Sequence, residues 1–223
     1  MNFWCEKKGG KAEKARRQRI KGSMKAIIFD LGGVYFTNGS KFLAKYIHEN
    51  FGKPESDVAY AITDSEFGLD YRKGRISRGE YWKKLLKTLA INEDFRKLEK
   101  VVFSEYMLIP GTREVVKKLR KKYKVVYLSN NVKERVDFLR SKFNFEGDFD
   151  FGIMSNEVGL IKPDPKIYEL ILERLEVGPE KCVFIDDREG NLRPARELGI
   201  KTILFKDSGQ LVEDLKKLGI KLD

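Results

Sequence analysis

Short apolar runs alternate with helical patterns along most of this chain, which is typical of an α/β protein with a parallel sheet. Three runs are rich in β-branched and aromatic residues and predict buried strands at 26–29, 125–128 and 182–185. Weaker runs predict strands near 150–154 and 202–205. Helices are expected at about 112–122, 132–142 and 209–218. Two further helices are expected, one that begins at Pro165 and one that ends near Gly199. We therefore expect a doubly wound, Rossmann-like parallel sheet.

The pattern changes between the first predicted strand and Pro110. Apolar residues in this stretch recur at helical spacing, and no segment of it predicts a convincing strand. We therefore divide the chain into an α/β core domain, residues 24–38 and 109–223, and an inserted α-helical cap domain, residues 39–108. A cap at this position would lie over the ligand crevice, where it would exclude water and contact the variable part of a substrate.

The charge of the chain is unevenly distributed. Of the 223 residues 41% are hydrophobic, and the formal net charge is +11, but residues 1–23 hold eight Lys or Arg against two Glu. We interpret this basic segment before Met24 as an added leader or an upstream extension that is disordered, and we expect no specific nucleic-acid binding. Because no apolar stretch is long enough to span a bilayer and no secretory signal is visible, we expect no membrane association and a cytoplasmic location.

Composition narrows the chemistry further. Charged residues make up 35% of the chain and Gln is rare, which supports the hypothesis of a thermophilic source. Two cysteines provide no disulfide framework. His48 is the only histidine, which excludes a histidine dyad or triad and any metal site built from several histidines.

Residues suited to phosphate chemistry follow the three strongest predicted strands. Asp30 ends the first, Ser129 the second, and Asp186 with Asp187 the third. Because ligands of open parallel sheets bind beyond the carboxyl ends of the strands, we expect these side chains to converge. Two adjacent carboxylates repel each other, and a hard cation that bridges them to Asp30 would relieve that repulsion.

Each candidate also has an ordinary interpretation when it is taken alone. Asp30 could cap a turn, Ser129 and Asn130 could cap the following helix, and Lys162, in the segment GLIKPDP, could be a surface lysine. Taken together they fit one reaction, in which an ionised aspartate attacks phosphorus. A Mg²⁺ ion held by carboxylates, together with a lysine and a hydroxyl, would neutralise the phosphoryl charge.

Four segments carry a family resemblance: FDLGGV at Asp30, LSN at Ser129, GLIKPDP at Lys162, and FIDDREGN at Asp186 and Asp187. In this order they resemble the motifs of haloacid dehalogenase (HAD) superfamily hydrolases with a helical C1-type cap, and the resemblance covers essentially residues 24–223. The segments IDDREGNLRPARELGIKTILF and KGRISRGEYW are similar to the N-terminal phosphatase domain of soluble epoxide hydrolase and to the bacterial alpha-D-glucose-1-phosphatase group.

The resemblance implies a role for each matching residue. Asp30 would be the nucleophile, Ser129 and Asn130 would bind the phosphoryl oxygens, and Lys162 would steady both the nucleophile and the phosphate. Asp187 would bind Mg²⁺, with Asp186 beside it in the catalytic group. The implied sets are Asp30, Lys162 and Asp186 for catalysis; Ser129, Asn130 and Lys162 for substrate; and Asp30, Gly32 and Asp187 for metal.

One position departs from the family pattern. Phosphatases of the superfamily usually carry a second aspartate two residues after the nucleophile, as general acid and base, and here that position is Gly32. The backbone carbonyl of Gly32 would still serve as a metal ligand. Losing general acid-base help would lower the rate by roughly 10² to 10⁴, most strongly for poor leaving groups.

The leading hypothesis is a Mg²⁺-dependent phosphatase, a phosphoric monoester hydrolase, that hydrolyses a small phosphorylated metabolite, such as a sugar phosphate, through an aspartyl-phosphate. Its partner would be that small molecule, and the protein would be a monomer or a homodimer. One alternative is a 2-haloacid dehalogenase, which uses its aspartate on carbon and needs no metal. A second is a catalytically weak or inactive phosphate-binding protein, because of Gly32. A phosphomutase is disfavoured because it relies on the missing acid-base residue.

Overall fold

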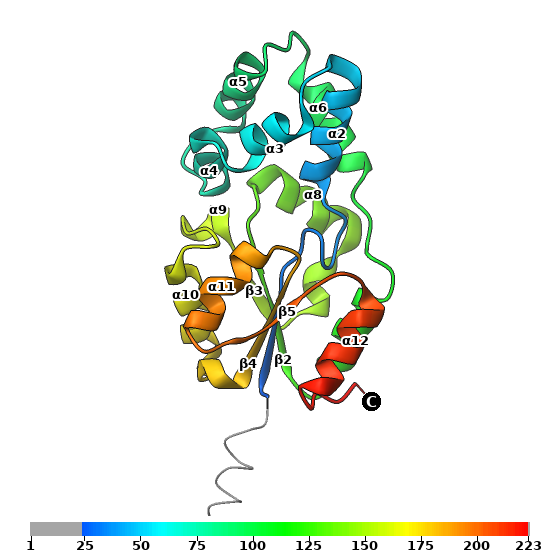
Figure 1. Ribbon diagram of the computed structural model, residues 1–223, viewed down its shortest axis with the longest axis vertical. Helices are drawn as coiled ribbons and strands as arrows, with labels where there is room; N and C mark the ends of the chain where they lie inside the picture. Colours follow the sequence, from blue (N-terminus) through cyan, green and yellow to red (C-terminus); the bar gives the residue numbers. More distant parts are fainter. Residues whose placement is uncertain (1–23, 223) are drawn as a thin grey trace, which may run out of the picture.

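Five parallel strands form the sheet at the centre of the computed structural model, which describes residues 24–222 (Figure 1). The strand order is β3-β2-β1-β4-β5. The strands are β1 (Ala26–Phe29), β2 (Lys124–Ser129), β3 (Phe151–Met154), β4 (Cys182–Asp186) and β5 (Lys201–Leu204). The predicted doubly wound parallel sheet is confirmed, and β1 lies at its middle between β2 and β4.

The three central strands end side by side because of their register. Phe29 in β1 pairs with Tyr127 in β2 and with Ile185 in β4. The backbone N–H of Asp30 donates to the carbonyl of Ile185 at 2.8 Å, which continues the ladder by one residue. The residues that follow the three strands therefore emerge at one edge of the sheet.

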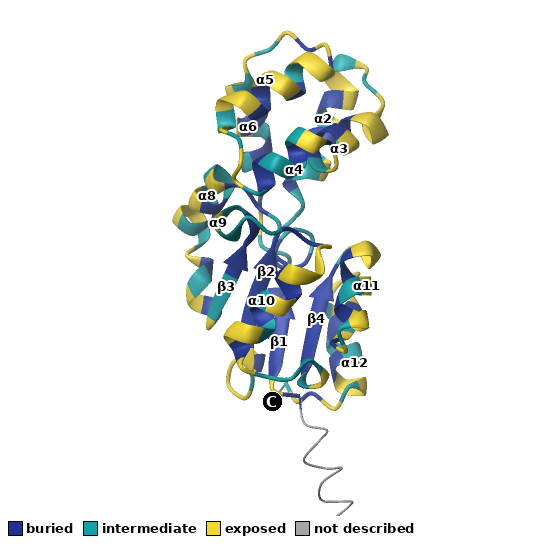
Figure 2. Cartoon of the chain, turned by 90° about the vertical axis from the view of Figure 1, so that its left-hand side faces the viewer, coloured by how far each residue is buried: buried dark blue, intermediate teal, exposed yellow. Residues whose placement is uncertain are grey.

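Helices cover both faces of the sheet. The face that includes Ile27 and Phe29 packs against α7 (Thr112–Leu119), α8 (Lys133–Phe143) and α12 (Ser208–Lys217). The other face, which includes Ala26 and Ile28, packs against α10 (Pro165–Leu175) and α11 (Glu189–Glu197). The alternation of β1 side chains between two buried clusters is the pattern of a strand covered on both sides, and the strands are correspondingly dark in Figure 2.

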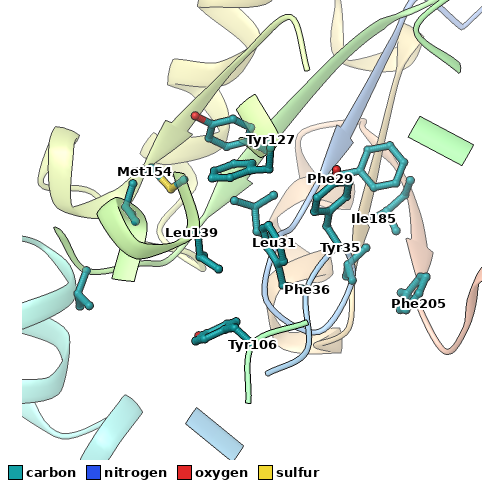
Figure 3. Close-up of a cluster of buried hydrophobic side chains, with 14 of the residues drawn as sticks. Phe29, Leu31, Tyr35, Phe36, Tyr106, Tyr127, Leu139, Met154, Ile185 and Phe205 are labelled. Atoms are coloured by element: carbon teal, nitrogen blue, oxygen red, sulfur yellow. The ribbon is translucent and has the colours of Figure 1, made fainter. Parts of the chain in front are cut away.

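Aromatic residues fill much of the first face. Figure 3 shows Phe29, Tyr35, Phe36 and Tyr127 among the buried side chains there. The rings of Tyr35 and Phe36 meet edge to face with centroids 4.9 Å apart. This packing fixes the chain just after β1, where it leaves the sheet.

Local signals explain where several helices begin. Asp164 caps α10 by accepting from the backbone N–H of Lys166, and Pro165 is its first residue, as predicted. The helix that starts at Thr112 ends at Leu119, earlier than the expected position 122, because the chain turns there to enter β2 at Lys124. The remaining short elements are α9 (Ser155–Val158), η1 (Phe145–Asp148) and η2 (Pro179–Lys181).

A group of helices lies beyond the carboxyl ends of the strands (Figures 1 and 2). They are α2 (Gly39–Phe51), α3 (Glu55–Thr63), α4 (Glu66–Arg72), α5 (Arg78–Thr88) and α6 (Phe95–Ser104), and we call residues 39–104 the helical region. Side chains of Asn38, Ser65, Ser77 and Asp94 cap α2, α4, α5 and α6. This insertion after the first strand is the all-helical one that the apolar spacing predicts.

Two expectations concern the ends and the surroundings of the chain. The basic leader expected at 1–23 lies outside the described residues. Within residues 24–222, no helix has the length and apolar character needed to cross a membrane.

Candidate active site

The loops that follow the central strands line one cavity of about 70 Å³. It is lined by every predicted site residue except Asp186, namely Asp30, Gly32, Ser129, Asn130, Lys162 and Asp187. Asp186 is fully buried directly behind it at the end of β4. The structure therefore brings together the side chains that follow three separate strands and the lysine from the loop before α10.

Lys162 is almost fully buried, with 3% of its surface exposed. Its Nζ donates to Asp30 Oδ1 at 2.8 Å and to Asp186 Oδ2 at 2.7 Å. The Asn130 amide holds the lysine in place, since Asn130 Nδ2 donates to the Lys162 carbonyl and Asn130 Oδ1 accepts from the Lys162 N–H. Lys162 is therefore not a surface lysine, and the Asn130 side chain supports the loop that carries it.

Asp186 is held by a ring of donors. Its Oδ1 accepts from the Arg188 backbone N–H at 2.9 Å, and the Asn191 amide donates to both of its oxygens at 3.0 and 3.1 Å. Its Oδ2 accepts from Lys162. With every oxygen engaged, Asp186 is suited to fixing the charge and position of the lysine.

The carboxylates that face the cavity are electrostatically strained. Burial raises the pKa of Asp30 to about 7; Lys162 opposes this rise, while Asp186 and Asp187 add to it. Burial and the neighbouring Asp186 likewise raise the pKa of Asp187, against the pull of Lys41. Burial disfavours the Lys162 ammonium, but the attraction of Asp186 and Asp30 outweighs it and raises the pKa of Lys162.

These acids fit a hard divalent cation. Carboxylate oxygens of Asp30, Asp186 and Asp187 lie within 4.8 Å of one another. Crowded carboxylates with raised pKa values are stabilised when a cation neutralises them, and carboxylate and carbonyl oxygens are the ligands that Mg²⁺ prefers. Because Asp186 is occupied by donors, Asp30 and Asp187, with the backbone of Gly32 beside them, are the residues best placed to hold such an ion.

A glycine lets the Asp187 carboxylate approach the backbone after β1. Gly33 has a φ of +91°, and a Cβ built on it would lie 2.4 Å from Asp187 Oδ2. Any larger residue would displace this carboxylate. Gly32 differs, because its Cβ position has no other atom within 4 Å. The place where a second carboxylate would stand is therefore open space in the cavity wall.

Sequence reasoning missed several charged residues of the cavity. Arg72, Arg135 and Arg188 line it, and Lys41 Nζ lies 3.3 Å from Asp187 Oδ2. Arg72, Arg135 and Lys41 carry no signal in the sequence, because charged residues are frequent throughout this chain and most are at the surface. Asn191 belongs to a recognised motif, but its two hydrogen bonds to Asp186 follow only from the fold.

Comparison with known families gives a match over most of the chain. The profile of haloacid dehalogenase-like hydrolases matches residues 24–199. A phosphorylated carbohydrates phosphatase of Thermotoga maritima is 31% identical over 191 residues, which cover 81% of this chain and 84% of that protein. Bifunctional epoxide hydrolase 2 of Rattus norvegicus is 46% identical over 70 residues, which are 31% of this chain and only 13% of that longer protein.

Solved structures show the same fold. A HAD family enzyme of Bacteroides thetaiotaomicron, solved as a magnesium complex, superposes with a TM-score of 0.72 at 24% identity, over 87% of this chain and 99% of that one. The L-2-haloacid dehalogenase of Xanthobacter autotrophicus superposes with a TM-score of 0.61 at 20% identity, over 86% and 82% of the two chains. The fold is thus shared by proteins with different named activities.

Proposed function

The chain belongs to the haloacid dehalogenase-like hydrolase family, and from that premise we propose that it is a Mg²⁺-dependent phosphatase of small phosphorylated metabolites. The observation that carries the proposal is the Asp30 carboxylate, which faces the cavity and is held 2.8 Å from the buried Lys162 ammonium. The similarity of this chain to the T. maritima phosphatase of phosphorylated carbohydrates supports a phosphate ester as the substrate, with a sugar phosphate as one candidate.

In the first step, an Asp30 oxygen attacks phosphorus and the bond between phosphorus and the ester oxygen breaks. The ester oxygen leaves with the bonding pair and takes a proton from water, which releases the alcohol and leaves an aspartyl-phosphate. Lys162 holds the nucleophile in place and neutralises phosphoryl charge, and the loop of Ser129 and Asn130 binds the phosphoryl oxygens.

In the second step, a water molecule attacks phosphorus, the acyl-phosphate bond breaks and the Asp30 carboxylate is restored with inorganic phosphate. Since Gly32 provides no proton donor, the leaving group depends on water for its proton, and we expect rates to fall as the leaving alcohol becomes less acidic. Asp30 and Asp187, with the Gly32 backbone, would hold Mg²⁺, which supplies neutralisation of the developing phosphoryl charge.

We propose residues 39–108 as a cap domain and residues 24–38 and 109–223 as the core domain. The helical region lies over the carboxyl ends of the strands (Figure 1), and Arg188 of the core pairs with Asp64 of the helical region at 3.7 Å. A cavity of about 70 Å³ is small beside the roughly 300 to 1,000 Å³ of typical ligand pockets. We therefore expect that the cap has to move before a substrate larger than a small ester can enter the cavity.

The test is hydrolysis of p-nitrophenyl phosphate with Mg²⁺. We expect turnover in the wild type and a loss of at least about 10³-fold in Asp30→Asn, because the attacking oxygen is removed. Asp207→Asn is the matched control, since Asp207 caps α12, does not line the cavity, and Asn caps equally well.

Gly32 favours one alternative, a phosphate-binding protein with weak or no turnover. Binding of phosphate esters without product would support it and would contradict the phosphatase. Chloride release from 2-chloropropionate in EDTA would instead support a 2-haloacid dehalogenase. The cluster of Asp30, Asp186 and Asp187 disfavours the dehalogenase, because attack on an uncharged carbon needs no metal.

A further inference from the structure

Two arginines separate the catalytic cavity from a second cavity inside the molecule. Arg72, the last residue of α4, and Arg135 in α8 line both cavities. The second cavity extends into the helical region and includes the aromatic residues Tyr71, Tyr81 and Trp82 in its lining. The rings of Tyr71 and Tyr81 stack with centroids 4.2 Å apart, so this wall is firmly packed.

Neither arginine has a carboxylate partner among the described residues. Arg72 is only 9% exposed, and its guanidinium donates to the Thr63 carbonyl. The Nε of Arg135 is buried without a hydrogen-bond partner, and its guanidinium lies over the Tyr106 ring at 5.7 Å. Buried charges are normally paired, so two unpaired guanidinium groups at one cavity require an explanation.

The other cations of the catalytic cavity are paired. Lys162 contacts Asp30 and Asp186, and Arg188 contacts Asp64. The acids of the second cavity are engaged elsewhere. Glu99 accepts from Arg78 at 2.9 Å, and Glu134 accepts from the Tyr71 hydroxyl at 2.7 Å.

The two arginines lie close to each other and to the nucleophile. Both line the same two cavities, and burial and then the charge of Arg135 lower the pKa of Arg72 to about 10, against the opposing charge of Asp64. Burial raises the pKa of Tyr106; Arg135 and Arg72 both lower it, and Asp30 raises it. The charges of both guanidinium groups and of the nucleophile therefore act on the pKa of one tyrosine that lines the catalytic cavity.

Arg72 is held rigidly in this position. The Ser155 hydroxyl donates to the Arg72 carbonyl at 2.7 Å and accepts from the Asn131 N–H at 2.9 Å. This link ties the end of α4 to the loop after β2, and the hydrogen bond to Thr63 fixes the guanidinium at the other end. A preorganised, uncompensated pair of guanidinium groups is suited to binding an anion from outside the chain.

We propose that Arg72 and Arg135 form a second anion site, and that the substrate carries a carboxylate or a second phosphate on a short carbon skeleton beside the reacting phosphate. This inference rests on the proposed phosphatase function and narrows its substrate class. The reacting phosphate is bound by Lys162 and the loop of Ser129, so the arginines receive the other end of the molecule. The small volume of the catalytic cavity keeps the two ends close together.

The test compares ligands that differ in the second anion alone. Binding is measured by calorimetry with Mg²⁺ in Asp30→Asn protein, which prevents turnover. The pairs are 3-phosphoglycerate against glycerol 3-phosphate for a carboxylate, and propane-1,3-diol bisphosphate against the monophosphate for a phosphate. We expect the member with the second anionic group to bind about tenfold tighter or more in at least one pair, since charge-assisted bonds to guanidinium are strong.

Arg72→Gln or Arg135→Gln on the same background should reduce that preference to about twofold or less, which corresponds to losing the charge-assisted bonds. Arg135→Gln serves if Arg72→Gln fails to fold, and Arg75→Gln, which alters an exposed arginine of the helical region, is the matched control and should keep the full preference. No preference in either pair, or no detectable binding of the members that carry a second anionic group, overturns the inference.

Equal weakening of both members of a pair also overturns it, because the arginines would then bind the reacting phosphate. The preference is independent of turnover. If it is present while the wild type hydrolyses no phosphate ester, the anion site stands and the phosphatase proposal fails.

Discussion

Two buried cations at the catalytic cavity are treated in opposite ways by the fold. Lys162, in the core, is 3% exposed and contacts two carboxylates, whereas Arg72, in the helical region, is 9% exposed and, within residues 24–222, donates to a backbone carbonyl and pairs with no carboxylate. At the sheet edge, the charge of Lys162 is balanced by carboxylates of the chain itself. The only ligand that this edge still calls for is a cation between its carboxylates. In the part of the chain that the structure describes, no carboxylate forms an ion pair with Arg72.

The difference between the two cations separates two tasks, the positioning of the reacting groups and the selection of the substrate. The reacting groups follow strands whose register is fixed by continuous ladders, so the protein determines their geometry before substrate arrives. The arginines belong to helices α4 and α8, and no carboxylate of the described residues forms an ion pair with them. We therefore assign the proposed chemistry to the core, and the proposed selectivity to the place where the helical region meets it.

The largest expected contrast is in stability. Lys162→Met leaves Asp30 and Asp186 buried without their counter-ion and should lower the free energy of unfolding by about 3 to 5 kcal/mol. Arg72→Met loses one hydrogen bond to Thr63 but also removes an unpaired buried charge, so it should cost no more than about 1 kcal/mol. Urea unfolding of both variants without Mg²⁺ measures the contrast.

Lys181→Met is the control for the substitution itself, because this partly exposed lysine has Glu180, at 3.9 Å, as its ion-pair partner among the described residues. Similar losses in Lys162→Met and Arg72→Met would mean that the two cations are equally compensated. The distinction between a complete core site and an incomplete helical side would then be wrong.

The next contrast concerns what the core lacks. Gly32→Asp places a carboxyl group in open space at the cavity and should raise kcat/KM for poor leaving groups, such as glycerol phosphate, by about 10²-fold through proton transfer. The gain for p-nitrophenyl phosphate should be much smaller, because its leaving group needs little protonation. Steady-state kinetics on the two substrates measure the difference.

Gly32→Asn is the matched control, since it has the same shape and no proton to give. If Asn produces the same gain as Asp, the effect is one of packing, and the core site is not limited by a missing acid.

Much of the core site could be predicted from the sequence, for a physical reason. A buried parallel strand is a continuous apolar run, and the residue that ends it lies at the ligand edge whatever the rest of the fold does. Asp30, Ser129 and Asp187 are therefore recognisable as candidates from the sequence alone. That Lys162 meets both Asp30 and Asp186 needed the fold, because a lysine in a loop is usually solvated.

The pair of arginines, Arg72 and Arg135, could not be predicted in this way. Arg72 and Arg135 are two charged residues in a chain that is 35% charged, and nothing local distinguishes them from surface arginines. Their significance is the absence of a carboxylate partner among the described residues, which depends on the placement of every neighbouring helix. Tyr71 and Trp82 line the second cavity while packing against Tyr81 and Phe95, and helical spacing alone does not separate these two tasks.

A smaller effect tests whether the core acids need a cation. Mg²⁺ at about tenfold above its dissociation constant should stabilise the wild type by about 1.4 kcal/mol, seen as a higher melting midpoint. Asp187→Asn should lose this shift. Because the raised pKa of Asp187 means that its ionised form is disfavoured on folding, Asp187→Asn should also be more stable than the wild type in EDTA at neutral pH.

Asp207→Asn should keep the Mg²⁺ shift, since this capping residue of α12 belongs neither to the carboxylate cluster nor to the lining of the cavity. A full shift in Asp187→Asn would place the cation elsewhere and would remove the reason for the crowding of acids at the sheet edge.

The smallest effect probes the joint between the two regions. Ser155→Ala removes the hydroxyl that donates to the Arg72 carbonyl and accepts from the Asn131 N–H, and should cost about 1 kcal/mol of unfolding free energy. If this joint positions Arg72, the variant should also lose part of the preference for ligands with a second anion while hydrolysis of p-nitrophenyl phosphate changes little. Ser104→Ala, which removes an exposed hydroxyl bonded within α6, is the control. A stability loss with an unaltered preference would show that the helical region aligns Arg72 without help from the core, and the two regions would then be more independent than the Ser155 link indicates.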